Sequence, residues 1–86
     1  MAVMVTAKIE KTSAVYDLEL PTDVPAGELL DDIVEALNGY DPSLSLQISD
    51  CELYDPQRER ALKGNATLKE AGVVNGDYIY LRERHF

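Results

Sequence analysis

Apolar and polar residues alternate near the N-terminus and again after a short polar break. The first run places every second residue of 3–9 on one side, and the second does the same for 16–20; the members are Val3, Val5, Ala7 and Ile9, then Tyr16, Leu18 and Leu20. A period of two indicates half-buried strands, and two such runs close together predict a β-hairpin. The connecting residues contain no glycine, so we expect no tight two-residue turn.

The period changes to that of a helix after Pro21. Apolar residues recur at helical spacing, with Ala26, Leu30, Ile33 and Leu37 on one stripe and Leu29 and Val34 beside it. Pro25 suits a first helical turn, and Asp23 or Val24 is the expected cap, with Val24 favoured because it precedes a proline. Gly39 is expected just past the end, in left-handed backbone. The outer side carries only acids, namely Glu28, Asp31, Asp32 and Glu35.

The second half of the chain predicts further strands. Leu44, Leu46 and Ile48 alternate and predict a third strand, and a short fourth strand is expected either around 52–54 or around 60–62. Residues 67–70 match a capping box, and Gly72 would end a single helical turn. Asn75-Gly76 marks a turn before a last strand over 78–82, which points Ile79 and Leu81 inward.

This order of elements predicts one α+β domain over residues 1–86. A mixed four- to five-stranded sheet would pack on one α-helix, in the order ββαββ with a short helical turn before the last strand. The first and last strands are expected to be parallel neighbours in the middle of the sheet, because the helix lies in the connection between them.

Two segments resemble a known family. Residues 15–21, VYDLELP, and residues 66–82, ATLKEAGVVNGDYIYLR, resemble the ubiquitin-like β-grasp fold, and the second is most similar to the YukD family associated with type VII secretion. The resemblance implies a non-enzymatic, cytoplasmic adaptor that docks onto protein components of a bacterial secretion apparatus. A different class is also open: a small ubiquitin-like subunit of a multicomponent enzyme such as a diiron monooxygenase.

Charge and composition narrow the range of partners. The net charge is −8, and residues 1–43 hold nine acidic residues against two lysines, a net charge of −7. Nucleic acids and anionic membranes are therefore unsuited to this half, whereas a basic protein surface suits it. No run approaches the ~20 apolar residues that span a bilayer, so no membrane insertion is expected. The single cysteine, Cys51, cannot form an internal disulfide and suits a reducing cytosol.

Two surfaces are candidates for protein docking. The open face of the sheet would display Met4 and Thr6 beside Tyr78 and Tyr80, and methionine and tyrosine are favoured at interface cores. The other candidate is the acidic helix face, in which Glu28/Asp32 and Asp31/Glu35 form like-charge pairs with no lysine or arginine to relieve them. The sequence leaves the oligomeric state open.

Chemistry at single residues is not expected. Conjugation requires a C-terminal glycine pair, but the last glycine is Gly76 and the sequence closes on RERHF, so we expect no covalent attachment. His85 has no serine or cysteine placed to form a catalytic triad. Three helix carboxylates without turn carbonyls make a poor calcium site, so we expect neither a metal nor a cofactor.

Overall fold

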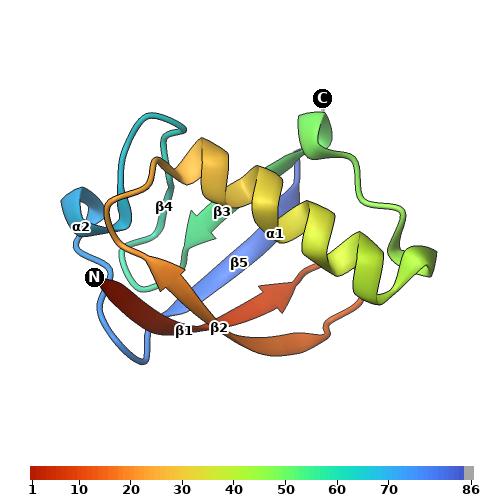
Figure 1. Cartoon of the computed structure of the whole chain (residues 1–86), viewed down its shortest axis with the longest axis horizontal. Helices are drawn as coiled ribbons and strands as arrows, with labels where there is room; N and C mark the ends of the chain where they lie inside the picture. Colours follow the sequence, from red (N-terminus) through yellow and green to blue (C-terminus); the bar gives the residue numbers. More distant parts are fainter. Residues whose placement is uncertain (85–86) are drawn as a thin grey trace.

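The computed structural model describes residues 1–84, and the interpretation of His85 therefore lies outside the described residues. A five-stranded sheet in the order β2-β1-β5-β3-β4 carries the long helix α1 across one face (Figure 1). The elements are β1 (Ala2–Ile9), β2 (Val15–Pro21), α1 (Ala26–Tyr40), β3 (Cys51–Asp55), β4 (Arg60–Ala61), α2 (Leu68–Ala71) and β5 (Tyr78–Glu83). The predicted ubiquitin-like β-grasp architecture is confirmed.

The first and last strands lie side by side at the centre of the sheet, as predicted. β1 and β5 run parallel, with Thr6 opposite Tyr78 and Ile9 opposite Leu81. β2 pairs antiparallel with β1, and β3 pairs antiparallel with β5. The loop between β1 and β2 is longer than two residues, as predicted from the lack of glycine there. Within it Ser13 adopts left-handed backbone.

The core lies between α1 and the covered face of the sheet. It is built mainly from the inward residues of both, and α2 adds Leu68. Its buried members include Val5, Ile9, Leu29, Val34, Leu53, Ile79 and Leu81. The predicted helix stripe is confirmed at Ala26, Ile33 and Leu37, which are buried. It is wrong at one position, because Leu29 is only 2% exposed while Leu30 is half-buried. Leu29, and not Leu30, is therefore the leucine on which α1 packs most tightly.

Both predicted ends of α1 are wrong. The cap position belongs to Pro25, and no side chain caps the helix. Carbonyl groups of a distant loop instead accept the first helical N–H groups, since Ala26 N donates to Ala66 O over 2.8 Å and Gly27 N donates to Gly64 O over 2.9 Å. Gly39 is not left-handed but helical, and the helix runs on to Tyr40 before Pro42 prevents further helical hydrogen bonding.

The third strand predicted over 44–48 is also wrong. The segment forms two 3₁₀ turns, Pro42–Leu44 and Ile48–Asp50. Leu44 and Leu46 are buried as their alternation indicated, but Ile48 is exposed. The side-chain amide of Asn38 takes the place of a strand partner: it donates to Leu46 O and accepts from Leu46 N, each over 2.9 Å. Alternating apolar residues are therefore buried here although the segment is not a strand.

Both positions considered for the short strand are strands, β3 and β4, and they pair antiparallel. The capping box is confirmed, because the Thr67 side chain accepts from Glu70 N while the Glu70 carboxylate accepts from Thr67 N. Gly72 and Gly76 adopt φ values of +79° and +88°, which explains glycine at the end of α2 and in the turn before β5. No helix of the described part of the chain has the length and apolarity to cross a membrane.

We predict that Leu29→Ala lowers the free energy of unfolding by about 2–5 kcal/mol, because it leaves a cavity in a small core. Leu30→Ala is the matched control on the neighbouring, half-buried position, and it should cost clearly less. Urea denaturation of both variants measures the difference. Equal losses would contradict the packing of α1 described here.

Candidate docking surfaces

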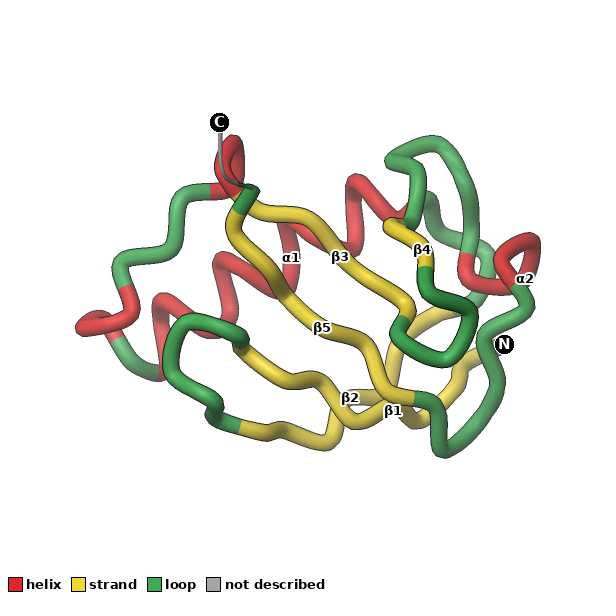
Figure 2. Tube along the Cα trace, turned by 180° about the vertical axis from the view of Figure 1, so that it is seen from behind, coloured by secondary structure: helices red, strands yellow, loops and turns green. Residues whose placement is uncertain are grey.

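The face of the sheet opposite α1 is open, as the view from behind shows (Figure 2). Side chains from alternate positions of β1, β5 and β3 lie on it in cross-strand rows. One row pairs Thr6 with Tyr78, and Thr6 also neighbours Asp17 of β2. Met4 and Tyr78 are large apolar side chains left about half exposed, at 47% and 49%. Aromatic and methionine side chains of this kind are typical of interface cores.

Two of the four residues predicted for this face have different neighbours from those expected. Met4 lies before the β1–β5 pairing begins and is held by the turn, since its N–H donates to Asn75 Oδ1 and its carbonyl accepts from Gly76 N, each over 2.9 Å. Tyr80 stands opposite Lys8, and not beside Met4 or Thr6. We use "apolar patch" below for Met4, Thr6 and Tyr78.

Tyr80 belongs to a separate cluster that sequence reasoning missed. The Lys8 ammonium lies 5.8 Å from the centre of the Tyr80 ring, and the Tyr54 ring lies 6.3 Å from the Tyr80 ring on the other side. The Arg82 guanidinium stacks 3.9 Å from the centre of the Tyr54 ring and pairs with Glu52 at 2.7 Å. These contacts leave Tyr80 and Tyr54 half-buried. Lys8 and Arg82 alternate with the core residues of their strands, but Tyr54 could be placed only with the position of β3.

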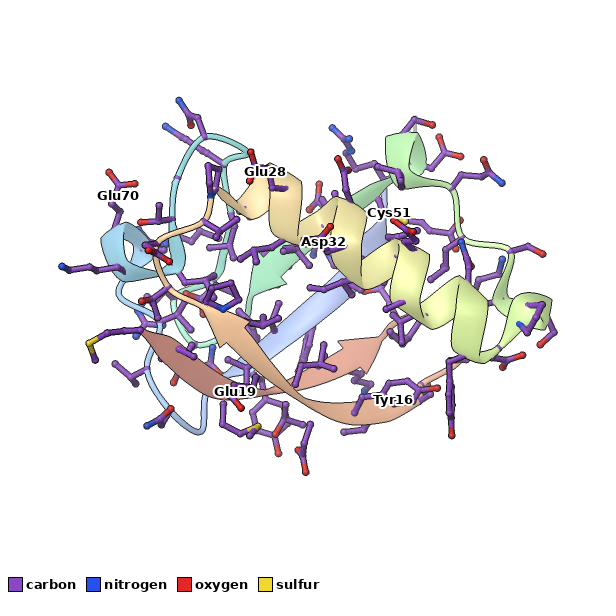
Figure 3. All side chains as sticks on the ribbon, viewed as in Figure 1. Tyr16, Glu19, Glu28, Asp32, Cys51 and Glu70 are labelled. Atoms are coloured by element: carbon purple, nitrogen blue, oxygen red, sulfur yellow. The ribbon has the colours of Figure 1, made fainter. Side chains whose placement is uncertain are left out.

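The acidic helix face lies on the opposite side of the molecule. Figure 3 shows Glu28 and Asp32 along α1, in front of the sheet. Glu28, Asp31, Asp32 and Glu35 are all exposed, and none of the ion pairs among residues 1–84 involves them. The two predicted surfaces therefore cannot form one site.

The acids of α1 differ in their surroundings. Asp31 borders a hollow beside β3 and β4, where Lys63 and Arg84 also line the wall. Asp32 borders a groove on the other side, between α1 and β2, where the nearby charged residue is Glu19. Negative charge is therefore least compensated on the β2 side of the helix. Among residues 1–84, no three histidine, cysteine or carboxylate side chains are grouped so as to hold a metal ion.

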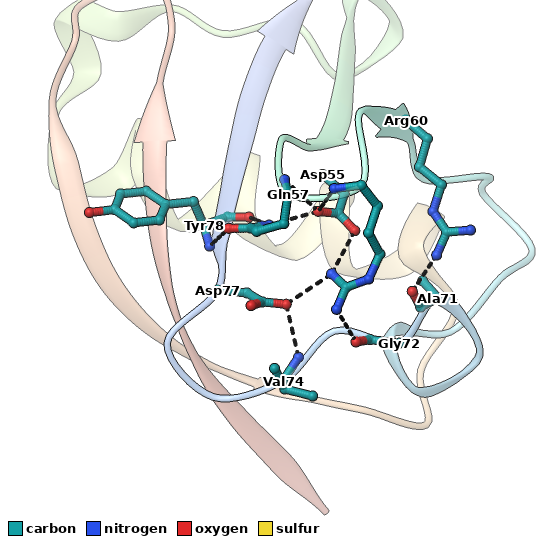
Figure 4. A network of polar contacts seen from close by, with 9 residues as sticks. Asp55, Gln57, Arg60, Ala71, Gly72, Val74, Asp77 and Tyr78 are labelled. Atoms are coloured by element: carbon teal, nitrogen blue, oxygen red, sulfur yellow. Dashed lines mark hydrogen bonds and ion pairs between the residues drawn. The ribbon is translucent and has the colours of Figure 1, made fainter.

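The buried carboxylate of Asp55 holds together the end of the sheet at which β5 begins (Figure 4). The Asp55 side chain is fully buried and accepts from the backbone N–H groups of Gln57 and Arg58, at 3.1 and 3.2 Å. The Arg58 guanidinium links Asp55 to Asp77 with 3.0 Å contacts to both carboxylates, and it also donates to Gly72 O. The loop after β3 is thereby tied to the turn that precedes Tyr78.

Gln57 completes the hydrogen bonding of Tyr78. The β3–β5 register would place Pro56 opposite Tyr78, and proline has no N–H to donate. The Gln57 side chain supplies both groups instead: its amide nitrogen donates to Tyr78 O over 2.8 Å, and its carbonyl oxygen accepts from Tyr78 N. The Tyr78 ring points away from this network in Figure 4, so the polar contacts position its backbone and leave the ring free.

Comparison with models of protein families shows the family to which this chain belongs. Residues 3–81 match the model of the family described as WXG100 protein secretion system (Wss), protein YukD. The chain belongs to the YukD family. A search of the curated proteins finds no match.

Solved structures share the fold of this YukD-family chain at low sequence identity. The EccD5 ubiquitin-like domain from Mycobacterium xenopi is 17% identical, with a TM-score of 0.78 over 100% of this chain and 98% of that one. A chain of the MycP5-free ESX-5 inner membrane complex is 19% identical, with a TM-score of 0.80 over 99% of this chain and 21% of its own length. Ubiquitin from Caldiarchaeum subterraneum is 20% identical, with a TM-score of 0.74 over 100% and 98%. These likenesses establish the ubiquitin-like fold.

Burial and nearby groups displace the pKa values of Asp55 and Cys51 in this YukD-family chain. Burial alone would raise the pKa of Asp55, but hydrogen bonds from Gln57 and Arg58, together with the Arg58 charge, outweigh it and hold the pKa below its usual range. Burial, followed by the nearby charges of Glu83 and Asp50, raises the pKa of the Cys51 thiol. Cys51 is therefore a protonated core residue and not a reactive thiolate.

We predict that Asp55 makes folding sensitive to acid. Because its pKa is lower in the folded chain than in the unfolded chain, its stabilisation is complete above its ordinary pKa of about 3.9 and is lost as the pH falls through the folded value. Asp55→Asn should therefore lower the free energy of unfolding at pH 7 by about 1.5–3 kcal/mol and flatten its decline below about pH 4. Urea titrations from neutral to acid pH measure both effects. Glu59→Gln, at an exposed position, is the control and should behave like the parent.

We predict that the acidic helix face is held at a small cost in stability. Glu35→Lys replaces the repulsive Asp31/Glu35 pair with an attractive one in the favourable order, so it should stabilise the fold by about 0.5 kcal/mol. The gain should shrink in about 0.5 M NaCl, because salt screens exposed charges. Thermal unfolding at low and high salt measures both effects. A variant no more stable than the parent at low salt would show that charge repulsion on this face does not lower the stability of the fold.

Proposed function

We propose that this chain is a non-enzymatic adaptor of a bacterial type VII secretion system, acting in the cytoplasm by docking onto other components of the apparatus. The observation that carries the proposal is the apolar patch, presented on a sheet face that α1 leaves open. Membership of the YukD family supplies the context of secretion, and it favours secretion over the diiron-monooxygenase alternative.

Three features support docking through the apolar patch. Met4 and Tyr78 expose about half of their surface, which a partner would bury. The backbone on either side is fixed, by the β1–β5 ladder and by the Gln57 side chain, so little conformational entropy would be lost on binding. A chain of similar fold occurs in an ESX-5 inner membrane complex, and components of such an apparatus are the partners that we propose.

We propose that the docking is non-covalent. Gly76 is the last glycine of the sequence. It lies in the turn before β5, where its N–H donates to Met4 O and its φ of +88° shapes the turn. A glycine held in this way serves the fold. The acidic helix face would provide a second contact, suited to a partner with a basic surface.

We predict that Tyr78→Ser keeps the fold but weakens partner recovery. The ring points away from the core while Ile79 and Leu81 stay buried, so only a modest loss of stability is expected. A tyrosine at the centre of an interface contributes about 2 kcal/mol or more, equivalent to about thirtyfold in affinity. Affinity purification of secretion-system components from the native host, with quantification of each component, measures the effect.

Tyr40→Ser is the matched control, because Tyr40 is 77% exposed and lies at the end of α1, away from the apolar patch. It should recover the same components as the parent. The proposal fails if Tyr78→Ser, confirmed as folded by circular dichroism, recovers every component as well as the parent does. A chain that is recovered with no secretion component at all would contradict the assignment to the apparatus.

A further inference from the structure

The outer edge of β2 is a free strand edge. β2 pairs with β1 on one side only, at the end of the sheet order. The bonds from Ile9 N to Ala14 O and from Thr22 N to Met1 O fix the phase of the antiparallel ladder, so even-numbered residues of β2 bond to β1. The backbone groups of Val15, Asp17 and Glu19 consequently point away from the sheet. An extended segment of another chain could pair with them as an added strand.

An apolar groove lies directly beside this edge. It has a volume of about 260 Å³ and separates β2 from α1; its apolar wall is formed by Leu18, Leu20, Leu29, Ile33, Ala36 and Leu37. The helix does not fully cover β2, because Leu18 stays half-buried while Leu20 is buried. Every second side chain of a strand added to β2 would point to the helix side, over this groove.

The charges around the edge select the occupant. From Val15 to Tyr40 the sequence contains no lysine and no arginine. The side chains of Asp17 and Glu19 lie on the open face of the sheet, since they alternate with the inward Leu18 and Leu20. Asp32 borders the groove from α1. Figure 3 shows Glu19 near β2 and Asp32 on α1. A second copy of the chain would bring the same carboxylates against them, and like charges across paired strands are destabilising. A basic strand would instead place its lysine or arginine side chains opposite Asp17 and Glu19.

We propose that the β2–α1 groove binds an extended segment of a partner protein in which apolar residues alternate with lysine or arginine. The segment adds to β2 as a sixth strand, its apolar side chains enter the groove, and its basic side chains face Asp17 and Glu19. This goes beyond docking through the apolar patch, because it uses a separate surface and a different kind of recognition. It rests on the proposed function only in that the ligand is a protein.

The test uses a synthetic peptide on the full chain. The probe is a fluorescein-labelled peptide of about seven residues, matched to the length of β2, in which lysine and valine alternate. We expect saturable binding by fluorescence anisotropy, with amide chemical-shift changes at Val15, Asp17 and Glu19 and slower hydrogen exchange at their N–H groups. A peptide with glutamate in place of lysine, and one of the same composition with its lysines contiguous, should bind at least about tenfold more weakly.

Variants of the chain separate groove binding from mere attraction of charge. Ala36→Arg places a long basic side chain at an exposed position on the groove wall, so the fold should persist while peptide affinity falls at least about tenfold. Glu19→Lys should act similarly, whereas Glu59→Lys makes the same change of charge at an exposed position elsewhere and should leave most of the affinity. Methylating the peptide N–H groups that face β2 should abolish binding, while methylating the other set should not.

Several results would overturn the proposal: equal binding of the alternating and contiguous peptides, insensitivity to Ala36→Arg, or shift changes confined to the Tyr78 face. Concentration-dependent dimerisation of the parent through β2, measured by analytical ultracentrifugation, would show that the edge serves a second copy. Tyr78→Ser should bind the peptide like the parent, because Tyr78 lies on β5 and outside the groove. Failure here therefore leaves the purification result for the apolar patch unaffected, and the two proposals are tested separately.

Discussion

The parallel pairing of β1 with β5 is the constraint on which the rest of the structure depends. It brings the two ends of the described chain together at the centre of the sheet, with Ala7 opposite Ile79 and Ile9 opposite Leu81. The chain between β1 and β5 must therefore leave the centre of the sheet and return to it. The helix α1 lies in this crossover connection and covers one face of the sheet. Because β2 follows β1 directly and β3 pairs with β5, the hairpin strand β2 is left at an edge. The face of the sheet opposite α1 is left open, because α1 covers the other face. The apolar patch and the β2–α1 groove are both consequences of this arrangement.

Regular periodicity made β1, β2, β5 and the helix predictable from sequence, and the capping box and the Asn75-Gly76 turn added fixed points in the second half. The segment around Leu44 and Leu46 misled the prediction because alternation reports which residues are buried, and not what bonds their backbone. Asn38 meets the backbone needs of Leu46 from α1, and nothing local to the segment signals that contact. Likewise, the helix start depends on carbonyl groups of Gly64 and Ala66, which lie far along the sequence.

Contacts between distant segments also decided which parts of the candidate sites could be predicted from the sequence. Tyr78 could be placed on the open face from alternation within β5 alone, and the acidic helix face from helical spacing alone. The Lys8–Tyr80–Tyr54–Arg82 cluster depends on two registers, Lys8 opposite Tyr80 and Tyr54 opposite Tyr80, which no single segment determines. Asp55 was similarly hidden. A buried carboxylate becomes intelligible only with Arg58 and Asp77 beside it, and Asp77 lies in a different loop.

The edges of the sheet differ in how much unpaired backbone they offer to another strand. β4 is two residues long, and a strand this short offers little for pairing. At the lower end of β5, the Gln57 amide occupies the backbone groups of Tyr78 that β3 no longer reaches. Within residues 1–84 this leaves β2 as the long unpaired edge, and its outward side chains include two carboxylates. Negative charge opposes pairing between copies of an acidic chain, yet it favours pairing with a basic one. The negative charge that disfavours pairing between copies is therefore also the feature that would specify the proposed ligand.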